Sequence, residues 1–226
     1  MVAKVDAEFV LPEGKSVFFA SDLHLGAPNG QASAERERAF VVWMDSIKPR
    51  AAALYLVGDV FDFWFEYRHA IPKGFARLQG RLADWSDSGI PIYMFTGNHD
   101  LWMRDYFVQE FGIQVFHEPI RHVWGAKHLV IGHGDGLGPG DTGYKLLKRV
   151  FTFKPFQTLF RWLHPDLGIG LASWLSRGSR ARTGHEDYAM TDVTREAIYL
   201  WALDQHTKAP ADYWIFGHRH FPVEAT

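Results

Sequence analysis

The chain has 226 residues, a length that favours one domain of ordinary α/β size with a substantial core. Apolar residues make up 47% of it and aromatic residues 15%, which excludes a disordered or low-complexity chain. Lys and Arg number 24 against 26 Asp and Glu, a formal net charge of −2, so the overall charge gives no sign of nucleic-acid binding and we expect no such partner.

Cysteine is absent, which excludes disulfides, thiolate zinc sites and cysteine nucleophiles. Any metal ion would have to bind to His, Asp, Glu or Asn side chains. The longest uninterrupted apolar run is Ala51 to Val57, far below the roughly 20 residues of a membrane-spanning helix. The first fifteen residues lack the basic segment and apolar core of a signal peptide. We therefore expect a cytoplasmic protein, with attachment to a membrane surface left open.

Short runs of β-branched and aromatic residues alternate with helical patterns along the chain. The runs predict buried strands at 16–20, 53–57, 92–96, 127–132 and 212–216. Apolar residues at helical spacing predict helices over 40–47, 75–85 and 193–201. A break at Gly125-Ala126 divides 121–132 into the two strands of a hairpin. This alternation predicts an α/β sandwich whose strands are buried between helical layers.

Residues 138–182 interrupt the alternation, and we expect them to form a helical insertion within a single domain of residues 1–226. The segment contains three prolines and has short apolar helical stretches in place of strands. Eight Lys or Arg residues lie within 144–182 against one acidic residue, Asp166, and apolar residues are interleaved with them. Such a surface could contact the head groups of an anionic membrane, at about 1 kcal/mol per basic residue.

Side chains of metal-ligand type follow each of the five predicted strands. Segments just beyond the carboxyl ends of neighbouring strands converge in an α/β sheet, so we expect side chains far apart in the sequence to meet in one crevice. Asp-x-His after the first strand and His-x-His after the last each place two side chains on the same side of an extended segment. The candidates are Asp22, His24, Asp59, Asp62, Asn98, His99, Asp100, His133, Asp135, His218 and His220.

The chemistry of these side chains favours two metal ions. Carboxylates, an asparagine amide and histidines are here too many for one tetrahedral site, and they suit manganese, iron or zinc. We expect two divalent ions, Mn²⁺ first, with Zn²⁺ or iron as alternatives. Pairs of such ions lie roughly 3.5–4 Å apart in hydrolases and stabilise the charge of an in-line attack on phosphorus. The other seven of the 12 histidines are expected to be hydrogen-bonded surface or core residues.

At these positions the sequence resembles the calcineurin-like metallophosphoesterases. The matching motifs are Asp22-Leu23-His24, Gly58-Asp59-Val60-Phe61-Asp62, Gly97-Asn98-His99-Asp100, Gly132-His133-Gly134-Asp135 and Gly217-His218-Arg219-His220. The resemblance spans nearly the whole chain and implies a four-layer α/β/β/α sandwich, with the insertion as a cap. It also implies two metal sites that share Asp59. One would be held by Asp22, His24, Asp59 and His220, and the other by Asp59, Asn98, His133 and His218.

A fifth histidine in these motifs is expected to act in catalysis instead. His99 comes directly after Asn98 and, in the family pattern, faces the substrate phosphate without binding metal. A cationic imidazole can stabilise the charge that develops on phosphorus, or protonate the leaving oxygen. Asp62 lies three residues after Asp59 and is the candidate to orient this imidazole.

Four segments, 58–66, 132–136, 141–144 and 159–166, resemble the UDP-2,3-diacylglucosamine diphosphatases of lipid A synthesis. The resemblance implies an acylated UDP-sugar as substrate, and UMP and 2,3-diacylglucosamine 1-phosphate as products. By position, Asp141 and Tyr144 match residues that line the substrate groove of that group. Basic side chains pair with phosphate through charge-assisted hydrogen bonds. The basic candidates for such contacts are Lys148, Arg149 and Arg180.

The insertion is richer in apolar residues than two short helices need for docking on a sandwich. The surplus favours a groove for acyl chains, with a hydrophobic lid or a dimer contact as the alternative. The residues are Val150, Phe151, Phe153, Phe156, Leu159, Phe160, Leu163, Ile169, Leu171, Trp174 and Leu175.

Two features depart from the diphosphatase group. Many of its members have arginine where His99 stands, so we expect different phosphate contacts in this chain. The chain also ends at Thr226, soon after His220, where family members usually add one or more strands, and we expect either a truncation or an unobserved tail there. The alternative functions are a two-metal phosphodiesterase or phosphatase acting on nucleotides or other small phosphoesters, and a scaffold that keeps the fold without activity.

Overall fold

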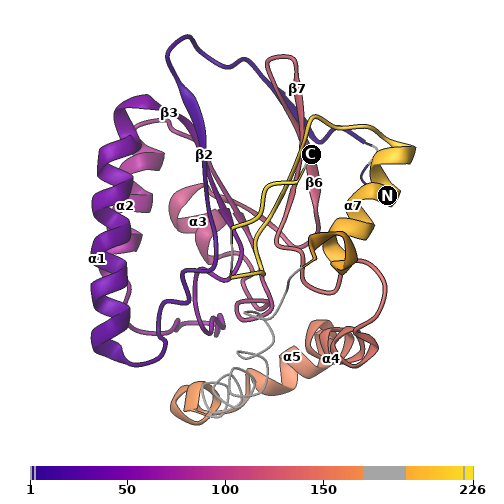
Figure 1. Ribbon diagram of the computed structural model, residues 1–226. Coiled ribbons are helices and arrows are strands. Elements are labelled where there is room, and N and C mark those ends of the chain that lie inside the picture. Colours follow the sequence, from indigo (N-terminus) through magenta and orange to yellow (C-terminus); the bar gives the residue numbers. More distant parts are fainter. Residues whose placement is uncertain (1, 3, 171–191, 221, 226) are drawn as a thin grey trace.

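Two four-stranded sheets lie face to face in the computed structural model, which describes residues 2, 4–170, 192–220 and 222–225 (Figure 1). The first sheet has the order β2-β3-β4-β5, and all of its strands are parallel. They are β2 (Ser16–Ala20), β3 (Ala51–Val57), β4 (Ile92–Phe95) and β5 (Gln114–Phe116). The second sheet has the order β1-β6-β7-β8, in which the β6–β7 pair is antiparallel. Its strands are β1 (Ala7–Phe9), β6 (Ile120–Trp124), β7 (Lys127–Gly132) and β8 (Tyr213–Phe216).

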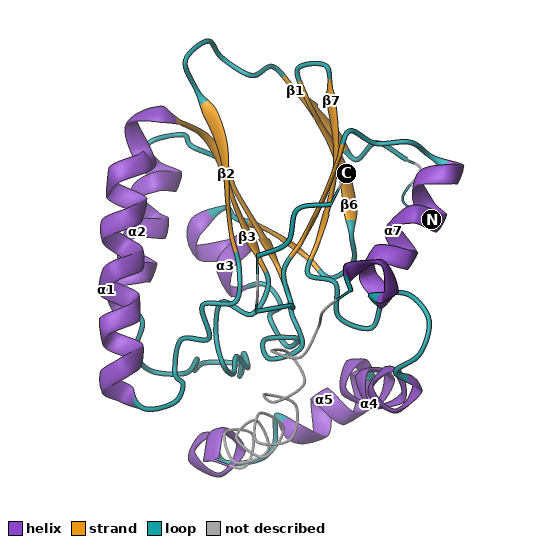
Figure 2. Ribbon diagram, in the orientation of Figure 1, coloured by secondary structure: helices purple, strands orange, loops and turns teal. Residues whose placement is uncertain are grey.

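Helices cover the outer faces of both sheets (Figure 2). The first sheet carries α1 (Gly30–Ile47), α2 (Ala76–Asp87) and the short α3 (Tyr106–Phe111), and the second carries α7 (Ala197–Lys208). The layers therefore run helix, sheet, sheet, helix, which confirms the predicted four-layer α/β/β/α sandwich. Among the described helices, none is long and apolar enough to cross a membrane.

The central strands are nearly continuous apolar runs because both of their faces are buried. Side chains alternate between the two faces along a strand. In β3, Leu54 and Leu56 pack against the helices, whereas Tyr55 and Val57 face the other sheet. The side chains of β4 alternate in the same way. These strands join the two halves of the core, and the loops at their carboxyl ends carry the polar side chains.

The five predicted strands and the hairpin are confirmed, and Gly125 supplies the positive φ (61°) at the hairpin turn. The structure adds β1, β5 and α3, which were not predicted because segments of three to six residues are too short to show a period. A 3₁₀ turn, Lys48–Arg50, also joins α1 to β3.

One predicted helix, over 193–201, is corrected. At Glu196 the backbone is extended (φ −65°, ψ 133°), which separates a 3₁₀ turn, Val193–Arg195, from α7. The Asp192 side chain caps that turn by accepting a hydrogen bond from Thr194 N (3.0 Å). The cap fixes the start of the turn, and the extended backbone at Glu196 ends the turn before α7 begins.

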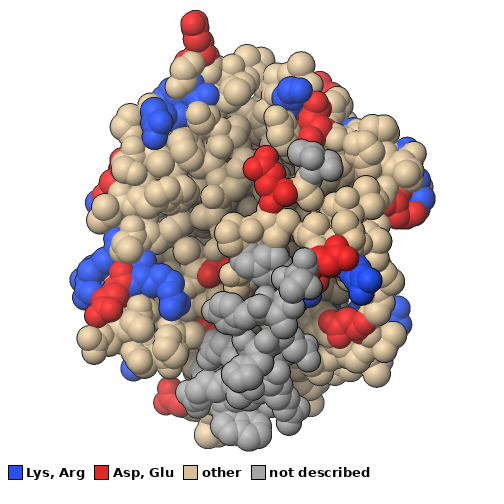
Figure 3. Space-filling model, in the orientation of Figure 1, with Lys and Arg blue, Asp and Glu red and all other residues tan. Residues whose placement is uncertain are grey.

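Charged side chains of both signs are interspersed over the face of the molecule seen in Figure 3. The described part of that face carries no extended field of one sign, in keeping with the formal net charge of −2. Local basic clusters, rather than the surface as a whole, therefore matter for binding anions.

The predicted insertion begins after β7 and lies at the carboxyl ends of the strands, outside both sheets (Figure 1). Its described part contains α4 (Thr142–Thr152), α5 (Lys154–Phe160) and helical backbone over 165–170. The rest of the expected insertion, 171–182, lies outside the described residues and includes the predicted phosphate contact Arg180.

The insertion packs on the loops that follow β3 and β4. Phe160 of α5 is buried, and its ring centre lies 4.8 Å from that of Phe65 and 4.7 Å from that of Trp102. The ring of Phe156 also contacts Trp102. Leu159, by contrast, is 68% exposed. The apolar residues expected to bind acyl chains therefore fall into two groups. Some, such as Phe160, pack the insertion against the loops, and others, such as Leu159, are exposed.

A buried hydrogen-bond chain between the sheets includes one of the histidines not assigned to metal. Trp124 Nε1 donates to Tyr55 Oη (2.9 Å), and Tyr55 Oη lies 2.7 Å from His122 Nδ1. When His122 Nδ1 is unprotonated, the hydroxyl that accepts from Trp124 can donate its own proton to this nitrogen. Burial lowers the pKa of His122 from 6.5 to about 4.

The buried His122 makes the stability of the folded protein depend on pH. The unfolded protein takes up a proton on His122 below pH 6.5, whereas the folded protein does so near pH 4, so stability is lost as pH falls from 6.5 towards 4. We expect His122→Asn to lower the melting temperature at pH 7 but to lose less stability than the wild type between pH 7 and pH 5. Urea unfolding at the two pH values measures this, and equal losses in both proteins would contradict it.

Candidate metal centre

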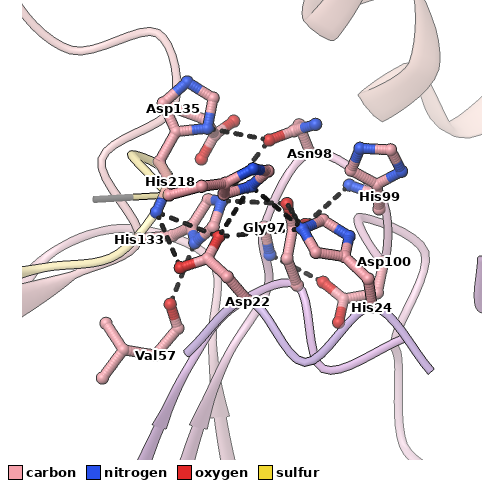
Figure 4. Close-up of polar contacts among 12 residues, drawn as sticks. Asp22, His24, Val57, Gly97, Asn98, His99, Asp100, His133, Asp135 and His218 are labelled. Carbon is pink, nitrogen blue, oxygen red and sulfur yellow. Dashed lines mark hydrogen bonds and ion pairs between the residues drawn. The ribbon is translucent and has the colours of Figure 1, made fainter. Parts of the chain in front are cut away.

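Side chains from five loops converge where strands of both sheets end (Figure 4). Asp22 and His24 follow β2, Asp59 follows β3, and Asn98 follows β4 in the first sheet. The second sheet supplies His133 after β7, and His218 and His220 after β8. From the sequence we expected the side chains beyond these strand ends to meet in one crevice. The structure brings all seven predicted ligands together, from two sheets.

One group of donors surrounds the Nε2 atom of His24. It lies 3.1 Å from His220 Nε2, 3.9 Å from Asp22 Oδ1 and 3.8 Å from Asp59 Oδ2. Asp22 Oδ1 is in turn 3.7 Å from His220 Nε2. Three atoms of this group, from Asp22, His24 and His220, all lie within 4.8 Å of one another, as the ligands of one ion do.

A second group shares Asp59 with the first. Asp59 Oδ2 lies 3.3 Å from His133 Nε2. Asn98 Oδ1 lies 3.4 Å from His133 Nε2 and 3.0 Å from His218 Nδ1. Asp59 therefore stands between the two groups, at the position predicted for a bridging ligand. Two carboxylates, an amide oxygen and four imidazoles in this arrangement form a donor set that fits a pair of divalent cations.

Strained backbone turns several of these side chains towards the centre. Residues other than glycine rarely adopt positive φ, which costs of the order of 1–3 kcal/mol and is concentrated at functional sites. Four predicted ligands have such a positive φ, and the packing of the surrounding fold must offset the cost of this backbone strain. The four are Asp22 (φ 56°), His24 (43°), Asp59 (50°) and His218 (71°).

The glycines of the motifs make room for the ligands. A Cβ atom at Gly97 would overlap the Asp59 carboxylate, and one at Gly58 would overlap the ring of His133. At Gly217, a Cβ would lie 2.8 Å from Asp22 Oδ2. Each glycine thus lets a neighbouring loop approach closely enough to place its ligand.

Hydrogen bonds orient the imidazoles. His133 Nδ1 donates to the Val57 carbonyl oxygen (2.9 Å), so Nε2 faces Asp59 and Asn98. The backbone N of His218 donates to both Asp22 carboxylate oxygens, at 3.1 Å each. Such contacts behind a ligand fix its tautomer and direction.

Burial sets the protonation of the cluster. It lowers the pKa of His24 to about 3 and that of His218 to about 4, so both rings are neutral at pH 7 and can offer a lone pair. Burial also opposes charge on His133, but the adjacent Asp59 carboxylate outweighs this and raises the pKa of His133 to about 10. The proton shared by that pair is one that a bound cation would displace.

The predicted catalytic pair lies beside the ligands. The backbone N of His99 donates to Asp59 Oδ1 (2.8 Å), and the ring of His99 stands edge-on to that of His24 with centres 4.8 Å apart. His99 Nδ1 is 3.3 Å from the Asp62 carbonyl oxygen and 3.6 Å from Asp62 Oδ1. Asp62 therefore contacts the imidazole through its backbone as well as its carboxylate.

The predicted substrate contacts meet at Asp135, a candidate ligand-type side chain that the sequence assigned to neither metal site. Asp135 is buried, and its Oδ2 accepts a hydrogen bond from Tyr144 Oη (2.5 Å) and pairs with Lys148 Nζ (2.8 Å). Asp141 caps α4 by accepting from Tyr144 N (3.3 Å). The sequence feature that pointed to Asp135 is its position in the Gly-His-Gly-Asp motif, two residues after His133.

A groove of about 1080 Å³ lies beside this cluster, lined by α4, α5 and the loops after β3, β4, β5 and β7. Seven Lys and Arg residues line it against four Asp and Glu, so the groove favours an anionic ligand. Arg149, a predicted phosphate contact, is among them. The basic residues are Arg68, Arg104, Lys145, Lys148, Arg149, Lys154 and Arg161.

Together, the sandwich and the shared donor set around Asp59 define a metal-dependent hydrolase of phosphoesters. A family model for calcineurin-like phosphoesterases matches residues 15–222. The chain belongs to this family, as the motifs predicted, and its centre is one for divalent metal ions.

Curated relatives cover most of the chain. A protein of *Porphyromonas gingivalis* named UDP-2,3-diacylglucosamine hydrolase is 34% identical, over 92% of this chain and 84% of its own. Proteins of the same name from *Aeromonas hydrophila* (30% identical) and *Yersinia pestis* (26%) each align with 92% of this chain and 83% of their own. A solved structure, a protein of unknown function from *Aquifex aeolicus*, aligns at 17% identity with a TM-score of 0.37, over 62% of this chain and 73% of its own. That likeness is too low to bear on the fold.

Proposed function

We propose that this protein hydrolyses the diphosphate of UDP-2,3-diacylglucosamine to UMP and 2,3-diacylglucosamine 1-phosphate, a step of lipid A synthesis. The observation that carries the proposal is a shared donor set at Asp59 beside a basic groove, in a chain whose relatives of that name align with 92% of it. In the reaction, water adds to the α-phosphorus of the UDP group. The bond to the bridging oxygen breaks, and that oxygen leaves with the sugar phosphate.

The protein's own residues have distinct parts in this proposal. Asp22, His24, Asp59, Asn98, His133, His218 and His220 would hold two divalent cations, for which we propose Mn²⁺. When bound, such cations activate water and neutralise charge that develops on the phosphoryl oxygens. His99 stabilises that charge or protonates the leaving oxygen, and its Nδ1 is oriented by Asp62 (3.3 Å to the carbonyl oxygen).

The basic groove is proposed to bind the anionic part of the substrate. Lys148 and Tyr144 are held at Asp135, and Arg149 lies one residue further along α4. Asp141, which begins α4, would set the position of this helix at the groove. We also propose that residues 138–182 are an insertion within a single domain of residues 1–226.

The test is direct. Purified protein is incubated with Mn²⁺ and UDP-2,3-diacylglucosamine, and UMP is measured. We expect UMP to form with Mn²⁺ and not after chelation of divalent cations. Much faster hydrolysis of small nucleotide phosphodiesters than of the lipid substrate would instead favour the alternative phosphodiesterase. A purified protein that binds no divalent metal would favour the inactive scaffold.

We also propose that the protein binds its lipid substrate at the cytoplasmic surface of a membrane. The described part of the insertion exposes large apolar side chains next to basic ones. Trp162 is 84% exposed and Leu159 68%, and Arg161 and Lys154 lie near them in sequence. Apolar side chains can enter the interface between head groups and acyl chains while basic residues pair with anionic lipids.

Replacing Leu159 and Trp162 together by aspartate tests this surface. We expect binding to vesicles containing phosphatidylglycerol to fall by roughly tenfold or more, because burial of a large apolar side chain contributes about 1.5–3 kcal/mol. Val42→Asp is the matched control, since Val42 is 67% exposed on α1, away from the insertion. Vesicle co-sedimentation measures binding, and an equal fall in both variants would contradict the proposal.

A further inference from the structure

Two of the loops that carry predicted ligands are joined to each other by buried carboxylates. Asp59 Oδ1 in the loop after β3 accepts a hydrogen bond from His99 N in the loop after β4 (2.8 Å). Asp100 makes the reverse connection, because its Oδ2 accepts from Phe61 N (3.2 Å). Its Oδ1 accepts from Gly97 N (2.7 Å), a contact within its own loop whose two residues are labelled in Figure 4. Both carboxylates belong to the motifs, and both act close to the metal centre.

A third carboxylate, that of Glu66, makes the same kind of connection further from the centre. Glu66 lies outside the motifs, in the loop after β3, and is 4% exposed. Its Oε1 accepts from Trp64 Nε1 (3.0 Å) and from Arg104 N (2.9 Å). Its Oε2 accepts from Asp105 N (2.8 Å) and Tyr106 N (3.1 Å). Four donors therefore converge on one buried carboxylate.

These hydrogen bonds hold the start of α3: one comes from Tyr106 N, the first residue of the helix, and two come from the backbone just before it. The side chain of Asp105, at the N-cap position, makes no capping hydrogen bond. The first N–H groups of a helix need an acceptor from outside it, and Glu66 supplies one from a different loop. The segment from Gly97 to Tyr106 is thus attached to the loop after β3 at both ends, by Asp100 near its start and by Glu66 at its finish.

We infer that Glu66 is a positioning residue for the metal centre. By fixing the far end of the 97–106 segment, it holds Asn98 and His99 at the distance from Asp59 that the site requires. Residues behind the ligands of a metal centre typically change metal affinity or activity by roughly 10–100-fold when replaced. The inference rests on the proposed function only in that the centre binds two divalent cations.

The chain offers a matched control in Glu37. This glutamate of α1 is also 4% exposed, and its Oε1 accepts from Arg77 N (2.9 Å) and Leu78 N (3.0 Å) at the start of α2. It is therefore a second buried carboxylate that caps a helix from another element. Neither α1 nor α2 carries a predicted ligand, so loss of Glu37 should weaken the fold without removing a contact to the loops after β3 and β4.

The experiment compares Glu66→Gln with Glu37→Gln in the full chain. Glutamine is nearly isosteric but turns a donor towards two of the four N–H groups at Glu66. Calorimetric titration of the metal-free proteins with Mn²⁺ measures affinity and stoichiometry, and bis(p-nitrophenyl) phosphate serves as a substrate without a lipid. We expect both variants to melt at lower temperature. Glu66→Gln alone should lose roughly 10–100-fold in Mn²⁺ affinity or in kcat, with KM little changed.

Two results would overturn the inference. One is wild-type Mn²⁺ affinity and wild-type kcat in Glu66→Gln, and the other is an equal loss in Glu37→Gln. If Glu66→Gln does not fold, Glu66→Asp takes its place in the same measurements of Mn²⁺ affinity and kcat. Aspartate keeps the negative charge but is shorter by one methylene group. If the wild type binds two Mn²⁺ but releases no UMP from the lipid substrate, the proposed substrate is refuted. The comparison of Glu66→Gln with Glu37→Gln still tests the positioning role, because it uses Mn²⁺ binding and a substrate without a lipid.

Discussion

Asp59→Ala is expected to abolish hydrolysis and to lower the content of both metals. Asp59 Oδ2 lies within 3.8 Å of His24 Nε2 and 3.3 Å of His133 Nε2, so one carboxylate serves both groups of donors. Its removal also leaves His133 without the charge that raises its pKa to about 10. The loss of several kcal/mol of charge stabilisation corresponds to a fall in turnover of more than roughly 10³-fold.

Metal analysis together with UMP release measures this prediction. Asp45→Ala is a suitable control, because Asp45 is an exposed carboxylate of α1 that pairs with Arg81 at the surface. The control should keep both metals and full turnover. Two full equivalents of metal in Asp59→Ala would contradict the bridging position.

His99→Ala is expected to reduce kcat by roughly 10²–10⁴-fold, the range for loss of a general acid, while metal content stays near normal. The reason is geometric. His99 contributes its backbone N to Asp59 (2.8 Å), which alanine retains, whereas its ring lies 4.8 Å from that of His24 at the centre. The substitution thus removes the imidazole without removing a predicted ligand.

His99→Arg separates the two roles of the imidazole. Arginine keeps a positive charge but cannot give up a proton at neutral pH. If the role is charge stabilisation, His99→Arg should turn over substrate faster than His99→Ala, and if it is protonation the two should be equally slow. Turnover and metal content are measured side by side. Unchanged turnover in His99→Ala would refute a catalytic role for this residue.

The metal centre was predictable because each of its motifs is local. Asp22 and His24, or His218 and His220, are two residues apart, so their spacing is visible in the sequence. A strand end before each motif then predicts where it lies. The family model and the sandwich confirm the class of enzyme, whereas the role of each site residue stays a prediction.

Contacts between loops were not predictable in the same way. Glu66 ends the 58–66 segment but lies outside the ligand motifs, and its partners Arg104 to Tyr106 lie about forty residues away in the sequence. Asp135 appeared in a motif, but its contacts with Tyr144 and Lys148 depend on how α4 returns to the sheet. The short strands β1 and β5 also form only because a longer neighbour pairs with them.

The amino-acid pattern by itself indicated an α/β sandwich, the positions of the long strands along the chain and the candidate ligands, since periodicity and motif spacing act over a few residues. Tertiary structure alone decided that the ligand loops come from two sheets, and which aromatic residues of the insertion are buried. The physical reason is that burial and long-range hydrogen bonds depend on the paths of several loops at once, which no single segment encodes.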